Sequence, residues 1–266
     1  MISLYKKYHI AYWCIGIALI IGMLTVMILF WRNDWYFPFL VVIPALLLVV
    51  VDAKFFTRLA SKKLSEEVLT LFNECQANRF INDLKSLFEG KTKGSVVSLY
   101  NTLLARGYSV IDDYDSAYEC CQKIKARNYM AERSKSMIDY YQSKDRIEEA
   151  HQEMEELKKL TEKMRNPQYK EGSEISIKNA EYVIRIKQGN YEGAEEYYRK
   201  MLDTITPLFP LTKVSYSYAL GRLLILKGEP ERAKEYLQTA YDSGGDTKYK
   251  KHAGELLQTL QDEKDM

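Results

Sequence analysis

The chain opens with two long runs of apolar residues that contain no charge. The first run, residues 10–31, reads IAYWCIGIALIIGMLTVMILFW, and its 22 residues would form a helix of roughly 33 Å, the thickness of a hydrocarbon core. The second run, residues 36–51, is shorter and contains two prolines. A cleaved signal peptide is the alternative for the first run, and a re-entrant or interfacial segment for the second. The pattern predicts a membrane anchor over residues 1–53, with two transmembrane helices at about 10–31 and 35–52.

Basic residues lie on the outer flanks of this hairpin. Lys6 and Lys7 precede the first span, whereas Arg32 is the only basic residue between the spans. Four more follow the second span: Lys54, Arg58, Lys62 and Lys63. Because cytoplasmic flanks retain positive charge, both termini and the rest of the chain are predicted to lie at the cytoplasmic face of the cell membrane. The four later residues could also contact anionic lipid headgroups, and a solvated linker helix is the equal alternative.

Beyond residue 55, apolar residues recur at spacings of three and four, a pattern that predicts an all-α region. One segment, residues 214–240, reads VSYSYALGRLLILKGEPERAKEYLQTA and consists of two helical stretches that a Gly-Glu-Pro turn divides. Its characteristic small and large residues are Leu220, Gly221, Leu224, Gly228, Ala233, Leu237 and Ala240. On these residues the segment resembles the tetratricopeptide repeat (TPR) family. The resemblance implies an α-solenoid of stacked helix pairs, in which small residues let two helices approach closely.

A second copy of this pattern precedes the first. Residues 189–201 are similar to the turn and second helix of the same repeat, with Ala194 at the small position and Tyr198 at the large one. Its first helix departs from the family pattern, because Glu181 and Arg185 stand where a leucine and an aromatic residue are expected. The resemblance is therefore carried by the second helix of this copy.

Fainter copies extend the array towards the N-terminus. They place Ala150 and Ala117 at the small position, and a still weaker one runs over residues 71–87. The four small-position alanines are 33, 44 and 39 residues apart, where the family repeat is about 34. We expect a degenerate TPR-like domain over residues 95–266, preceded over residues 54–94 by a basic juxtamembrane segment and a degenerate helix pair.

One apolar stripe explains the widest of these spacings. It predicts a single long helix over residues 145–165, and its members are Ile147, Ala150, Met154, Leu157 and Met164. The near-heptad spacing is also found in coiled-coil dimers, which leaves self-association open. Ordinary repeat packing is the favoured interpretation, because the stripe is short and includes Thr161.

Net charge limits the class of partner, and cysteine spacing indicates the redox compartment. The formal net charge is +2, and residues 1–53 contribute +1 of it, with three basic and two acidic residues. The remainder therefore lacks the one-sided basic field that phosphate neutralisation requires, so no nucleic-acid partner is expected. The four cysteines, Cys14, Cys75, Cys120 and Cys121, show no CxxC or metal-like spacing, which is typical of reduced cytoplasmic thiols.

No recognisable catalytic or metal-binding pattern occurs in the sequence. The histidines are His9, His151 and His252, and none belongs to a nucleophile or HExxH arrangement. Glu148, His151 and Glu155 share one helix face and could ligate a metal, but a solvated charged face explains them more simply. We therefore expect no enzymatic activity, no cofactor and no metal site.

The expected partner site follows from how such repeats stack, with first helices on the concave face. In the best copy, the first helix packs Leu220, Gly221 and Leu224 against its neighbours. Its other face therefore turns Tyr218, Arg222 and Ile225 towards the groove. If the preceding copy keeps the family phase, Asn179, Val183 and Ile186 join them. Such a mixture of aromatic, cationic and apolar side chains is typical of protein interfaces.

The resemblance also bears on the kind of partner. A protein or peptide ligand is expected, but not a chaperone tail, because Lys135 with Asp139 departs from the lysines and asparagines of the family's carboxylate clamp. The sequence thus predicts a membrane-anchored TPR-like scaffold that binds a protein or peptide at the cytoplasmic face. The alternative is a structural or accessory subunit of a membrane complex that acts through its transmembrane hairpin.

Overall fold

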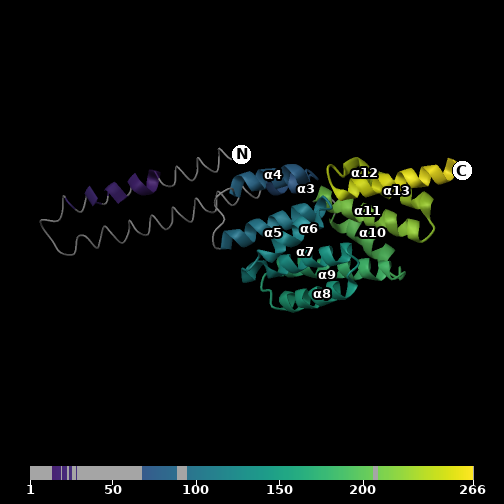
Figure 1. Ribbon diagram of the computed structural model, residues 1–266, viewed down its shortest axis with the longest axis horizontal. Helices are drawn as coiled ribbons and strands as arrows, with labels where there is room; N and C mark the ends of the chain where they lie inside the picture. Colours follow the sequence, from purple (N-terminus) through teal and green to yellow (C-terminus); the bar gives the residue numbers. More distant parts are fainter. Residues whose placement is uncertain are drawn as a thin grey trace. The chain divides into compact units, whose positions relative to one another are not determined.

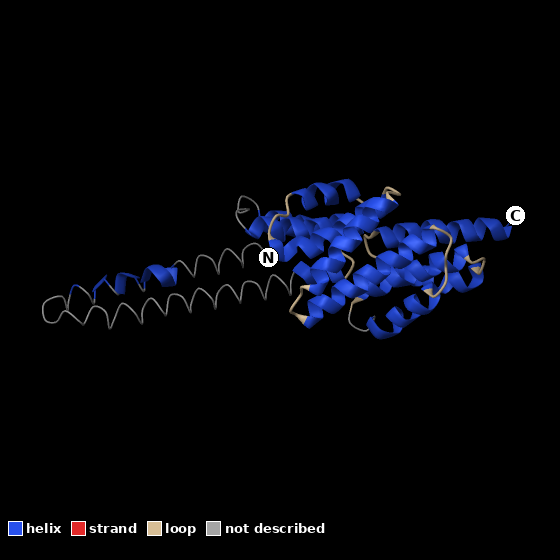
Figure 2. Ribbon diagram, turned by 90° about the horizontal axis from the view of Figure 1, so that it is seen from below, coloured by secondary structure: helices blue, strands red, loops and turns tan. Residues whose placement is uncertain are grey.

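Helices are the only regular secondary structure in the described part of the chain. The computed structural model describes residues 14–18, 20–22, 24–25, 28, 68–88, 95–205 and 209–265. Within these ranges no strand occurs, so the all-α prediction is confirmed (Figure 2). The chain divides into two compact units, Met1–Thr70 and Leu71–Met266.

The first unit contains both predicted membrane spans, which lie largely outside the described residues. The described positions between 14 and 28 are helical, and their apolar side chains are exposed, with Ile17 at 51% and Ile28 at 75%. Among the described residues, no helix combines the length and the apolar character needed to cross a bilayer. The second span and the basic residues Lys54, Arg58, Lys62 and Lys63 lie outside the described part.

The second unit is an array of antiparallel helices in which each helix packs mainly on its neighbours in sequence (Figure 1). A single 3₁₀ turn, Arg127–Tyr129, precedes α7. The α-helices are α3 (Thr70–Asn73), α4 (Ala77–Phe88), α5 (Ser95–Val110), α6 (Tyr114–Gln122), α7 (Met130–Ser143), α8 (Ile147–Glu162), α9 (Pro167–Lys187), α10 (Ala194–Ile205), α11 (Pro210–Leu226), α12 (Pro230–Ser243) and α13 (Lys248–Asp265).

One turn geometry recurs along the array. After α3, α5, α7, α9 and α11, the chain reverses through a residue with a left-handed φ between 55° and 78°: Cys75, Asp112, Asp145, Gly189 and Gly228. The next amide then donates to the carbonyl five residues back, as Glu229 N does to Leu224 O at 2.8 Å. This is the Schellman arrangement, which satisfies the last carbonyls of a helix and starts the next one.

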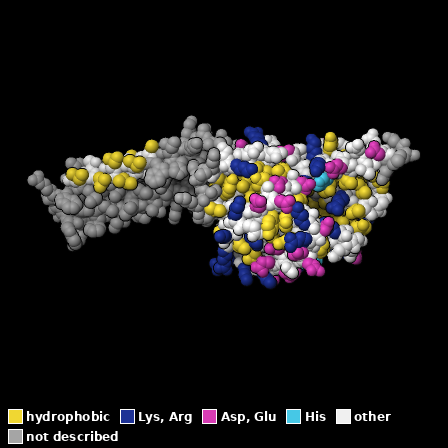
Figure 3. Space-filling view, in the orientation of Figure 1, with side chains coloured by type: hydrophobic (Ala, Val, Ile, Leu, Met, Phe, Trp, Pro, Cys, Tyr) yellow, Lys and Arg dark blue, Asp and Glu magenta, His cyan; other side chains and the backbone are white. Residues whose placement is uncertain are grey.

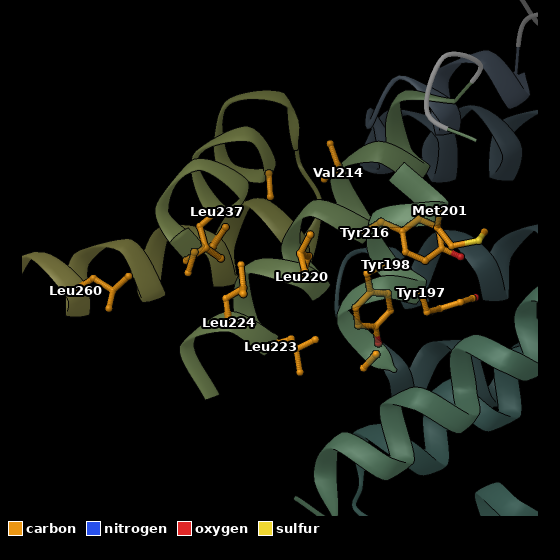
Figure 4. Close-up of a cluster of buried hydrophobic side chains, with 14 of the residues drawn as sticks. Tyr197, Tyr198, Met201, Val214, Tyr216, Leu220, Leu223, Leu224, Leu237 and Leu260 are labelled. Atoms are coloured by element: carbon orange, nitrogen blue, oxygen red, sulfur yellow. The ribbon is translucent and has the colours of Figure 1, made fainter. Parts of the chain in front are cut away.

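The small residues identified from the sequence lie at the closest helix contacts. Ala117, Ala150, Ala194 and Ala233 each lie five residues after a left-handed residue, and all are fully buried. Leu220, Leu224 and Leu237 are also at 0% exposure, and Tyr198 is at 1% (Figure 4). Ala240 is at 0% as well, whereas Gly228 is exposed in its turn. A Cβ placed on Gly221 would lie 2.7 Å from Leu237 Cγ, so α11 and α12 approach more closely than an alanine would allow.

The α9–α10 pair is built differently. These two helices make few close backbone contacts, and tyrosine rings fill the space between them. Tyr182 stacks on Tyr197 with ring centroids 4.6 Å apart, and Tyr198 and Tyr216 pack around them. Glu181 and Arg185, which depart from the family pattern, face outward: Glu181 pairs with Lys158, and Arg185 donates to Asn190 Oδ1.

The predicted long helix over residues 145–165 is shorter than expected. Helix α8 ends at Glu162, and Asn166 caps α9 by accepting from the amide of Gln168 at 3.0 Å. Asn166 and Pro167 thus start a helix of 21 residues, and its length contributes to the 44-residue spacing. The apolar stripe of α8 is buried within the same chain, against α7 and α9.

The two ends of the array meet. Asp246, in the turn between α12 and α13, accepts from the amides of Ala77 (2.5 Å) and Asn78 (2.9 Å), the first residues of α4. Its own amide donates to Cys75 O at 3.1 Å. Gly245 has a φ of +55°, and a Cβ there would lie 2.2 Å from the same carbonyl oxygen. The array therefore closes on itself through a backbone approach that requires glycine.

Substitution of Gly221 tests the close approach of α11 and α12. Gly221→Ala should destabilise the chain by about 1–3 kcal/mol, because the added methyl overlaps the buried Leu237 side chain. Gly172→Ala is the matched control, since a Cβ there meets no atom within 4 Å, and it should stabilise α9 by about 0.5–1 kcal/mol. Urea denaturation measures both, and effects of the same sign would contradict the helix spacing.

Substitution of Asp246 tests the closure of the array. Asp246→Ala should cost about 1–2 kcal/mol, because it leaves the first amides of α4 without their acceptor. Hydrogen exchange at Ala77 and Asn78 should accelerate with it. The control is Asp262→Ala, which removes an exposed carboxylate from α13. Unchanged protection at α4 would show that the two ends do not meet in solution.

Candidate functional site

A groove of about 900 Å³ lies on the inner side of the array. The first helices of three successive pairs, α7, α9 and α11, supply most of its lining, and α6, α10 and α13 complete it. Aromatic rings from four helices line it: Tyr114, Tyr198, Tyr216, Tyr218 and Tyr249. The groove is therefore concave, aromatic and several helices long, which suits an extended ligand better than a compact one.

Five of the six predicted partner-binding residues line this groove. They are Tyr218 and Arg222 on α11 and Asn179, Val183 and Ile186 on α9. Ile225 is not among the lining residues, because it packs, partly buried, against the apolar cluster of α10 to α13. Whether any of these residues contacts a partner stays a prediction.

Tyr218 has a packing role in addition to its place in the groove. Its ring centroid lies 5.9 Å from that of Tyr249 and 6.0 Å from that of His252, both on α13. Burial raises the pKa of the Tyr218 hydroxyl. Replacing this ring would therefore loosen α13, and Arg222 is the cleaner probe of ligand binding.

Some charged side chains of the groove form ion pairs and one, Arg222, does not among the described residues. At its edge, Lys144 forms an ion pair with Asp115 (2.9 Å) and Lys187 forms one with Asp145. Arg222 makes no hydrogen bond or ion pair within the described part of the chain. It is exposed, so its planar fork of donors is available to a ligand.

Contacts from α13 to α6 and to the turn before α6 close one side of the groove. Lys248 donates to the hydroxyl of Tyr114 at 2.6 Å, and His252 Nε2 lies 3.1 Å from Asp112 Oδ2. Burial raises the pKa of Tyr114, which therefore stays a neutral hydrogen-bonding group. These partners are 134 and 140 residues apart, so no local sequence signal could have identified them.

Asp139 is an acidic residue of α7 that lines the groove and is exposed to solvent. Enclosure by the groove walls removes part of the water around its carboxyl and raises the pKa, although the side chain remains accessible to solvent. The nearby Lys248 acts in the opposite direction. Lys135, which together with Asp139 departs from the family's carboxylate clamp, forms an ion pair with Glu132 at 2.7 Å.

The visible surface carries charges of both signs. Figure 3 shows basic and acidic side chains interspersed with hydrophobic ones over the face in view. On α8, Glu155 pairs with Lys158 at 2.9 Å, which engages one member of the Glu148, His151 and Glu155 set. Within the described residues, no group of histidine, cysteine, aspartate and glutamate side chains is arranged to hold a metal ion.

No family model, no curated protein and no solved structure matches this chain. The resemblance to the TPR family that the repeat residues indicate therefore stays a prediction.

Three thiols are enclosed in the array. Cys75 and Cys121 are fully buried and Cys120 is at 6% exposure. Burial raises the pKa of Cys75 and Cys120 to about 11 and that of Cys121 to about 12. Because the thiolate is the nucleophile, these side chains are unreactive packing groups.

The buried thiols predict a loss of stability at alkaline pH. Unfolding returns each thiol to its ordinary pKa of 9.0, so their stabilising effect is complete below pH 9 and declines as the pH rises towards 11. The free energy of unfolding should fall by at least about 2 kcal/mol over that interval. Denaturant midpoints at pH 8 and pH 10.5 measure the fall, which the triple variant Cys75→Ala, Cys120→Ala, Cys121→Ala should reduce. An equal fall in that variant would assign the effect to tyrosines instead.

Proposed function

We propose that this chain is a membrane-anchored TPR-like scaffold that binds an extended segment of a partner protein at the cytoplasmic face of the cell membrane. The observation that carries the proposal is the groove, which three successive first helices line together with tyrosines from α6, α10, α11 and α13. It also contains Arg222, which has no hydrogen bond or ion pair among the described residues. Tyrosine and arginine are frequent anchors of protein interfaces, because each combines a large contact area with directional hydrogen bonds. No catalytic role is proposed.

The membrane anchor in this proposal rests on the sequence of residues 10–52. Two uncharged runs of 22 and 16 residues, with basic residues on their outer flanks, support a hairpin with both ends in the cytoplasm. Such an anchor would confine the array to the membrane surface and raise its effective concentration towards a membrane-bound partner.

A structural or accessory subunit of a membrane complex is the second candidate, with the hairpin itself making the essential contacts. The uncharged spans favour it, since lipid-embedded helices associate through their own side chains. The two candidates differ in which part of the chain a partner needs.

Crosslinking from native membranes tests the scaffold. A photoreactive residue at Val183, in the groove, should capture a partner, and one at Gln152, exposed on α8, should not. In the Val183 background, Arg222→Ala should weaken capture by about 1–3 kcal/mol, or roughly 5- to 150-fold, without lowering the melting temperature. Arg165→Ala is the control, because it removes the same charge from an exposed site outside the groove.

Replacing residues 10–52 with an unrelated membrane hairpin separates the two candidates. A scaffold should keep its groove-dependent capture after the exchange, whereas an accessory subunit should lose it. Capture that is insensitive to Arg222→Ala but is lost with the exchange would contradict the scaffold and support the accessory subunit.

A further inference from the structure

A second cavity, of about 350 Å³, adjoins the groove and shares Asp139, Lys248 and Tyr249 with it. Helices α5, α7, α9 and α13 form most of its walls. Three of its lining residues are serines, Ser109, Ser136 and Ser176, and small side chains leave the space open. The volume is within the usual range for a small-ligand site, roughly 300–1,000 Å³.

The charges around this cavity leave one positive charge in excess. Arg106, Lys135 and Lys248 line it, against the carboxylates of Glu132 and Asp139. Burial acts to raise the pKa of Glu132, but Lys135 and Arg106 outweigh it, and the net effect lowers that pKa. Lys135 forms the ion pair with Glu132, and Lys248 acts on Asp139. Arg106 acts on Glu132 without an ion pair or hydrogen bond among the described residues, so it is the cation most available to an added anion.

Arg106 is held in a position that leaves its donors free. Its guanidinium carbon lies 5.2 Å from the ring centroid of Phe72, another lining residue of the cavity. A guanidinium that packs on a ring keeps its N–H groups at the edge, where they can bind a carboxylate in a bidentate manner. No hydrogen bond or ion pair engages them within the described part of the chain.

Ser109 supplies a second unengaged donor one helical turn further along α5. Its side chain is at 4% exposure and lines the cavity. Its Oγ has no hydrogen-bond partner among the described residues. A buried hydroxyl without a partner is costly, and an acceptor bound in the cavity would remove that cost.

We propose that this cavity is a carboxylate-binding pocket, in which the Arg106 guanidinium and the Ser109 hydroxyl bind the anion and Lys248 supports it. Two sources can supply the carboxylate: a free small carboxylic acid, or an acidic side chain of a segment bound in the adjoining groove. The first source is independent of the proposed scaffold function, and the second rests on it.

Titration of the purified full-length chain with small probes tests the pocket. Glutarate represents a free acid, N-acetylglutamic acid α-amide represents a side chain, and N-acetylglutamine amide is the uncharged control. At least one carboxylate should shift the backbone amide resonances of Ser109 and Ser136 saturably, and the uncharged probe should not. Absence of saturable shifts, or an equal response to the uncharged probe, would overturn the proposal.

Two variants connect the signal to the named donors. Arg106→Gln should weaken binding about tenfold or more, whereas Arg79→Gln, which removes the same charge from exposed α4, should leave it unchanged. Ser109→Ala should weaken binding while the melting temperature without probe stays equal or rises, because the lost hydroxyl has no hydrogen-bond partner among the described residues. Affinity that is unaffected by both substitutions would refute the assignment of the pocket.

Partner capture through Val183 then identifies the source. If an acidic side chain of the partner occupies the pocket, Arg106→Gln should weaken capture and glutarate should compete with it. If the ligand is a free acid, the probes should bind while capture stays insensitive to both. If Arg222→Ala loses capture but no carboxylate probe binds, the result would support the scaffold function and contradict the carboxylate-binding pocket.

Discussion

Each regular helix pair of the array depends on one backbone reversal, at a residue with a left-handed φ five positions before a buried small side chain. The reversal fixes the angle at which the second helix leaves the first, and the small side chain fixes how closely the two can pack. The first pair shows what happens without the alanine. Phe80 follows Cys75 by five residues, and Gly107 on α5 accommodates its ring, since a Cβ on Gly107 would lie only 3.1 Å from Phe80 Cδ1. The reversal is thus retained where the small residue is not.

Closure of the array turns this local geometry into an enclosed groove. A row of helix pairs alone would leave its concave face open along one side. Asp246 caps α4, Lys248 contacts α6, and His252 contacts Asp112 in the turn before α6. The N-terminal half of α13 therefore lies across that side. These three contacts join polar groups, whereas the contacts within a helix pair are mainly between buried alanine and leucine side chains. The closure therefore relies on hydrogen bonds to a greater extent than the helix pairs do.

The sequence predicts the parts of this structure that are local. The alanines and Gly221 were identifiable because close packing selects small residues at fixed distances from a turn. Contacts such as Asp246 with α4 were not, since 168 or more residues separate the partners and an aspartate before a helix is common at many positions. Helix α8 was predicted too long because a continuing apolar stripe says nothing of where a cap residue will start the next helix. Ile225 does not line the groove, because the last turn of α11 packs on the adjoining core.

The distribution of unengaged polar groups connects the fold with its proposed use. On the outer side, Glu195 contacts Lys227, Arg232 and Arg199. Hydrogen bonds from these cations lower the pKa of Glu195 to about 2, although burial acts to raise it. Within the groove and its side cavity, Arg222, Arg106 and the Ser109 hydroxyl have no such partners among the described residues. A chain selected for stability alone would pair or replace these groups, as it does on α10. Their presence at the concave surface, where a ligand would supply the missing acceptors, is the arrangement expected of a surface whose partners come from outside the chain.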